Sequence, residues 1–264
     1  MKEYIEYIFL ALIQGITEFL PVSSSGHIEF LKHIINNSTI QKEGAFITVI
    51  LHLATALSII VIFREKLKNL LFRHNSESKN YILKVLVSMI PVAILVLFNV
   101  DQNIEDKYNE GWGLIFIGLM FLITAIILFF TEKISIKTKN ITYIAALIIG
   151  IAQAIAILPG ISRSGLTICC ALLLGATKKE ASTFSFLICL PIILGKSFKD
   201  LVSFDILQSA EFNFPILIAF IFTFFIGLVC CKWMIKIVDQ SKLKYFGIYC
   251  FFISMSAFLF NILS

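Results

Sequence analysis

Residues 14–27 read QGITEFLPVSSSGH, and the architecture of the whole chain can be worked out from them. They lie inside an apolar stretch, about 4–36, that a Pro, a Gly and a cluster of Ser residues interrupt. Such residues break helical hydrogen bonding, so one unbroken helix is not expected here. The pattern predicts two short helices joined by a turn, as in a re-entrant segment.

The surrounding chain has the composition of a membrane protein. Of its 264 residues, 58% are hydrophobic and 15% are charged, with a mean hydropathy of +0.92. A water-soluble globular domain needs more charge than this. The net charge of +5 comes from Lys and Arg that cluster between apolar segments. A nucleic-acid binder is therefore excluded, and membrane lipids are the expected surroundings.

Six apolar segments have about the length that crosses a bilayer. They lie at about 44–63, 82–98, 112–131, 182–195, 214–231 and 245–263. The expected fold is an all-α integral membrane protein, a polytopic helical bundle that forms a single membrane domain over 1–264.

A second broken stretch, 141–177, contains LPGISRSG at residues 158–165. It matches the first at an offset of 139, which places Gln14 over Gln153 and Ser23 over Ser162. The chain therefore reads as two repeats, about 1–131 and 141–264. Each repeat has a re-entrant helix–loop–helix followed by three transmembrane helices.

The distribution of charge predicts how these repeats are inserted. Residues 64–84 carry six Lys or Arg, whereas residues 99–111 carry one Lys and four acidic residues. Basic segments tend to stay in the cytoplasm. With three spans after each re-entrant segment, the second repeat is then inverted relative to the first, and the two broken loops approach each other from opposite faces.

The two loops carry complementary polar groups. Placing the charged side chain of Glu18 at membrane depth costs free energy, and such residues usually have a partner and a function. Arg163 lies between two serines at the start of a predicted helix, and a guanidinium with a helix N-terminus suits a phosphate. His27 can exchange protons, and a neighbouring serine hydroxyl can attack or bind phosphorus. Together the loops predict a phosphoryl-transfer site.

Each of these residues also has a purely structural interpretation. Ser23 and Ser164 could only cap helices, and Arg163 could pair with Glu18 merely to neutralise both charges. His27 could equally be structural. Three further residues are interpreted as structural or interfacial because they lack a comparable constellation: His52, Lys196 and Lys199.

At these loops the sequence resembles the undecaprenyl-diphosphate phosphatase family, integral-membrane enzymes associated with bacitracin resistance. The resemblance rests on the motif from Gln14 to His27 and on a second, PGISRSGLT, from Pro159 to Thr167. It extends to HLATALSIIVIFR at 52–64 and FSFLICLP at 184–191, and so spans most of the chain.

The resemblance implies a function. Such an enzyme hydrolyses undecaprenyl diphosphate to undecaprenyl phosphate and inorganic phosphate. This recycles the lipid carrier for cell-wall synthesis and confers resistance to bacitracin. It also implies a multi-pass protein of the bacterial cytoplasmic (inner) membrane. An isoprenoid lipid diphosphate is the expected partner, and a homodimer is left open.

Site residues follow from the matched motifs. The resemblance makes Glu18, His27 and Arg163 catalytic, with Ser24 as nucleophile or phosphate contact. Whether Ser24, His27 or water attacks stays open. The expected substrate contacts are Gln14, Ser23, Ser25, Gly160, Ser162, Ser164 and Thr167.

The resemblance also implies a divalent cation, Mg²⁺ or Ca²⁺, which would neutralise diphosphate charge through oxygen ligands. Glu18 and Gln14 are the expected ligands. Many family members have a glutamate where this chain has Gln14, which weakens any site that needs two carboxylates, although an amide oxygen can still bind a hard cation.

Two other functions fit parts of the pattern. Inverted repeats and broken helices are typical of transporters, so an undecaprenyl phosphate transporter or flippase is the main alternative. Lipid phosphatases of the phosphatidic-acid type share short sequence fragments with these loops. Their second histidine would fall on Cys169, however, and the nucleophile of their mechanism would be missing.

Overall fold

The computed structural model describes residues 2–34, 38–73, 75–98, 100, 113–131, 140–202 and 214–263. Side chains are described for all of these except 2–5, 32–34 and 38–45. Within these ranges the chain is helical, with turns and no strand. An all-α membrane fold is thereby confirmed.

The described helices of the first half begin with a short pair, α1 (Lys2–Thr17) and α2 (Ser24–Ile34). They continue with α3 (Ser38–Ile62), α4 (Arg64–Phe72), α5 (Ser76–Leu97) and α7 (Gly113–Phe130). The second half also begins with a short pair, α8 (Tyr143–Ile155) and α9 (Arg163–Leu173). It continues with α10 (Lys178–Val202), α12 (Phe214–Asp239) and α13 (Lys244–Leu263).

Each of the six predicted spans corresponds to a long helix: α3, α5, α7, α10, α12 and α13. Among the described residues, five of these are long and apolar enough by themselves to cross a membrane. The sixth, α3, passes the same test together with α4, from which it is bent by 75°. The chain is therefore a multi-span membrane protein.

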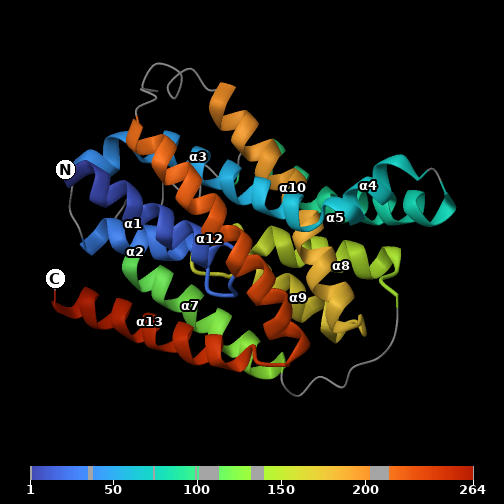
Figure 1. The fold of residues 1–264 in the computed structure, drawn as a ribbon. Helices are drawn as coiled ribbons and strands as arrows, with labels where there is room; N and C mark the ends of the chain where they lie inside the picture. The colour runs from blue at the N-terminus through green and yellow to red at the C-terminus, as the bar shows by residue number, and fades with distance from the viewer. Residues whose placement is uncertain are drawn as a thin grey trace.

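The two halves pack against each other in a reciprocal way. The short helix α1 packs on α12, and its counterpart α8 packs on α5 (Figure 1). The first long helices, α3 and α10, contact each other, as do the last long helices, α7 and α13. This pattern is what two related repeats would produce. Their opposite orientation in a membrane, and the repeat boundaries, stay predictions.

Both turns between the short helices lie inside the bundle (Figure 1). Phe19, Leu20 and Val22 of the first turn are buried in the main apolar core, with Phe121 of α7 and Ile168 of α9. Burial of these large side chains holds the first turn at the centre of the protein. The polar residues on either side of these side chains therefore also lie at the centre of the protein.

Candidate active site

The two turns touch each other, although they lie far apart in the sequence. The backbone N–H of Gly160 donates a hydrogen bond to Ser23 Oγ at 3.1 Å. In return, Ser164 Oγ donates to the carbonyl of Leu20 at 3.2 Å. Convergence of the two loops, expected from the sequence, is therefore confirmed.

Small residues make this approach possible. A Cβ atom on Gly26 would lie 2.7 Å from the Cα and N atoms of Gly160, and 2.8 Å from Cζ of Phe121. Gly160 itself has a φ of +96°, which disfavours any residue with a side chain. The loops meet backbone to backbone, which requires glycine at both positions.

Equivalent serines cap the two helices that leave the turns. Ser23 Oγ accepts from the N–H of Gly26 at 3.3 Å at the start of α2. Ser162 Oγ accepts from the N–H of Gly165 at 3.1 Å at the start of α9. Each is also close to the serine two residues on, Ser25 at 3.4 Å and Ser164 at 3.3 Å. Ser23 and Ser162 thus act as helix caps, and the four serines match at the offset of 139.

Glu18 lies at the centre of the site and is almost completely buried, with 3% of its side chain exposed. Its Oε1 forms an ion pair with Arg163 Nη2. Its Oε2 accepts hydrogen bonds from Gln14 Nε2 at 3.0 Å and from Ser24 Oγ at 2.7 Å. Ser24 and Arg163 are the first residues of α2 and α9. One carboxylate therefore joins the N-termini of both helices.

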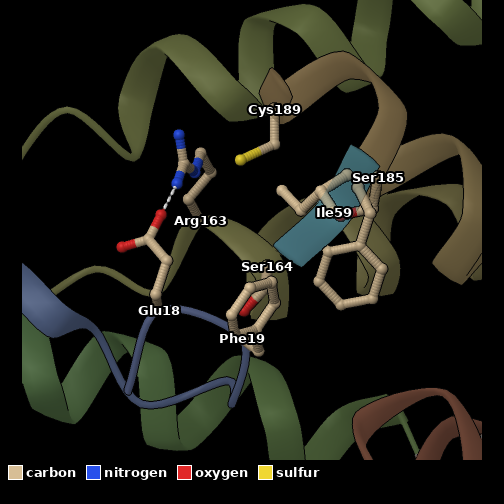
Figure 2. A pocket seen from close by; sticks show the side chains of 8 residues that line it. Glu18, Phe19, Ile59, Arg163, Ser164, Ser185 and Cys189 are labelled. Carbon is tan, nitrogen blue, oxygen red and sulfur yellow. Dashed lines mark hydrogen bonds and ion pairs between the residues drawn. The ribbon is translucent and has the colours of Figure 1, made fainter. Parts of the chain in front are cut away.

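A pocket opens beside this ion pair (Figure 2). The lining combines the two charged groups with small polar and apolar side chains: Glu18, Arg163, Ser164, Ser185, Cys189, Phe19, Ile59 and Phe186. A guanidinium has five N–H donors, so Arg163 can hold Glu18 and still donate to an anion.

Of the other predicted residues, Thr167 and Ser25 lie apart from this network. Thr167 is fully buried, and its Oγ1 lies 2.7 Å from the carbonyl of Arg163 and 2.6 Å from Ser185 Oγ. It braces the first turn of α9 against α10, whereas Ser25 is exposed.

His27 is held by two contacts of its own. Its Nδ1 lies 2.7 Å from the carbonyl of Ser23, and its Nε2 lies 2.8 Å from the hydroxyl of Tyr249. Its ring stacks on Tyr249 and meets Phe121 edge-on. Because a carbonyl only accepts, Nδ1 carries the hydrogen. His27 thus links the first loop to α13.

His52 of α3 is the site residue that the sequence interpretation missed. Its Nε2 lies 3.8 Å from Glu18 Oε2, although it was expected to be structural or interfacial. Its Nδ1 donates to the carbonyl of Thr48 at 2.8 Å. An imidazole inside an apolar span is itself a signal, since polar groups at that depth usually have a partner.

The residues around Glu18 fit a hard divalent cation. Gln14 is completely buried, and its Oε1 has no hydrogen-bond partner within the described part of the chain. Carboxylate, amide and hydroxyl oxygens are the donors that Mg²⁺ and Ca²⁺ prefer. Over the described ranges no group of three or more His, Cys, Asp or Glu could hold a metal, so waters and substrate oxygens would have to complete the shell.

Comparison with known proteins gives the family. The model of the family described as bacitracin resistance protein BacA matches residues 7–256. The chain belongs to this family. It is similar to a protein of Christiangramia forsetii named undecaprenyl-diphosphatase, with 44% identity covering 96% of each chain. Proteins with the same name from Thermosipho africanus (40%; 96% of this chain, 98% of the other) and Bacteroides fragilis (39%; 94% of each) are also similar.

The close contact of the loops can be tested through stability. We expect Gly26→Ala to lower the free energy of unfolding by about 1–3 kcal/mol, because the new methyl group meets backbone atoms that cannot move aside. Gly195→Ala is the matched control, since a Cβ there has nothing within 4 Å. Thermal unfolding in detergent measures both. Equal midpoints for the two variants would contradict the packing of the loops.

Proposed function

We propose that this chain is an integral-membrane phosphatase that hydrolyses undecaprenyl diphosphate to undecaprenyl phosphate and inorganic phosphate. The observation that carries the proposal is the buried Glu18, which binds a serine hydroxyl on one side and an arginine on the other. The names of the relatives agree with it.

Binding of the diphosphate rests on Arg163 and the two helix starts. The guanidinium offers planar pairs of donors that match phosphate oxygens. The N-termini of α2 and α9 add partial positive charge and backbone N–H groups. Since Ser24 and Arg163 both bind Glu18, these two helix ends lie at the same carboxylate. A strongly negative headgroup is the ligand that this arrangement favours.

For the chemical step, we propose Ser24 as the nucleophile and Glu18 as its base. Ser24 Oγ already donates to Glu18 Oε2 at 2.7 Å, and Ser24 is partly exposed, whereas Glu18 is buried. As the bond from Oγ to the terminal phosphorus forms, the bond from that phosphorus to the bridging oxygen breaks. Undecaprenyl phosphate leaves, and Glu18 takes the hydroxyl proton. A water molecule then attacks the phosphorus, the bond from phosphorus to Oγ breaks, phosphate leaves, and Glu18 returns the proton to Oγ.

A divalent cation, held by Glu18 and Gln14, would neutralise phosphate charge when bound. Within the chain itself, Arg163 orients the headgroup, and His27 keeps the first loop in place through Ser23 and Tyr249. We place the protein in the bacterial cytoplasmic membrane, where this reaction would recycle the lipid carrier for cell-wall polymers and give resistance to bacitracin.

The central experiment is phosphate release from a C55 or C15 isoprenyl diphosphate by the purified protein. We expect Arg163→Ala and Glu18→Gln each to lower kcat/KM by at least about 100-fold. The first variant removes the charge that binds the diphosphate, and the second removes the charge that activates the Ser24 hydroxyl. Arg64→Ala, whose side chain is exposed, is the control. Near-normal turnover in both site variants would refute the site. Transport of labelled undecaprenyl phosphate across vesicles without phosphate release would indicate a transporter instead.

The cation has its own test. Chelation with EDTA should abolish phosphate release, and added Mg²⁺ or Ca²⁺ should restore it. Undiminished activity of fully chelated protein would rule out a required cation while leaving the Arg163 and Glu18 assignments in place.

The nucleophile can be tested separately. We expect Ser24→Ala to reduce phosphate release at least about 100-fold at unchanged stability, because no hydroxyl then faces Glu18. Ser256→Ala, on the exposed face of α13, serves as the matched control. Substantial activity of Ser24→Ala would point to water or His27 as the attacking group instead.

A further inference from the structure

We infer that His52 is a third protein ligand of the divalent cation, so that the cation site consists of Gln14, Glu18 and His52. The inference rests on the cation of the proposed function and adds to it a nitrogen ligand from α3. A nitrogen ligand has a consequence for metal choice, because Ca²⁺ takes oxygen ligands, whereas imidazole suits transition metals.

The first argument is the orientation of the imidazole. Nδ1 donates to the carbonyl of Thr48 at 2.8 Å, which leaves Nε2 as the atom that faces Glu18. Histidines that bind metals almost always donate their other ring N–H to a carbonyl, a carboxylate or water. The carbonyl of Thr48, one helical turn before His52, thus fixes the ring with Nε2 directed at the carboxylate.

The second argument is the spacing of the ligand atoms around Glu18 Oε2. Neighbouring ligands of an octahedral metal with bonds of about 2.1 Å lie about 3 Å apart. His52 Nε2 lies 3.8 Å from Glu18 Oε2. This separation needs only a small adjustment for Nε2 and Oε2 to bind one ion.

The third argument is the unused oxygen of Gln14. The side chain is completely buried, and among the described residues nothing donates to Oε1. Such a group is costly unless it has a ligand. Because Nε2 is the amide atom that now donates to Glu18 Oε2, the amide would have to turn over when the ion binds, so that Oε1 takes the place of Nε2.

The charges around His52 permit a cation. Arg163, Lys196 and Glu18 are the charged groups that act on it among the described residues. Glu18 is the one negative charge among them; Arg163 pairs with its Oε1, whereas Oε2 is the oxygen nearest His52. The side chain of His52 is 30% exposed, compared with 3% for Glu18, so His52 lies nearer the surface than the carboxylate.

The test uses Mn²⁺ alone as the probe, on the full chain purified in detergent. Pulsed electron paramagnetic resonance of bound Mn²⁺ should show coupling to a ¹⁴N nucleus in the wild type, and His52→Leu should lose it. By calorimetry, His52→Leu should weaken Mn²⁺ binding at least about 10-fold and Ca²⁺ binding much less. Glu18→Gln should weaken both, and Ser256→Ala neither.

Mn²⁺ bound without nitrogen coupling, or with equal affinity in His52→Leu and the wild type, would overturn the inference. If His52→Leu fails to fold, His52→Asn keeps a polar side chain too short to reach the ion and should show the same loss. Cation-dependent phosphate release together with a negative result for His52 would remove this inference alone. Failure of the wild type to release phosphate would remove the proposed function.

Discussion

The structure depends on one buried carboxylate. Glu18 sits among apolar residues with 3% of its side chain exposed, and a charge in that position is tolerable only when it is paired and fully hydrogen-bonded. Its partners come from both broken loops: Ser24 from the first and Arg163 from the second. Satisfying Glu18 therefore requires two distant segments to meet, and the pocket lies beside that contact.

The internal similarity of the two loops shows how such a site is assembled. Ser23 and Ser162 cap their helices in the same way, so the two loops present helix N-termini to each other. Ser24 and Arg163 are equivalent at the offset of 139, and both are the first residue of a helix bound to Glu18. At this equivalent position the first loop supplies the hydroxyl of Ser24, and the second loop supplies the guanidinium of Arg163. The proposed site depends on this one difference between two otherwise similar loops.

The predictable part of the site is the part that lies in local motifs. Pro21 and the serines after it predicted the break between α1 and α2, and the glycine-rich second loop predicted the break before α9, because these residues interrupt helices wherever they occur. Glu18 and Arg163 stood out since charges at membrane depth need partners. Capping was predicted for Ser23 as one of two interpretations, but in the second loop it was predicted for Ser164 instead of Ser162, because capping and phosphate binding use the same hydroxyl.

By itself, the sequence determined the number of long helices, the two broken segments and the pairing of acidic and basic loops, because these follow from hydropathy and helix-breaking residues along the chain. Only the tertiary structure decided which side chains face Glu18. The tertiary structure places His52, whose neighbours in sequence are apolar, beside Glu18. It places His27 against Tyr249 and not against Glu18. Which face of a helix points at a given residue depends on how whole helices pack, and that information is spread over the entire bundle.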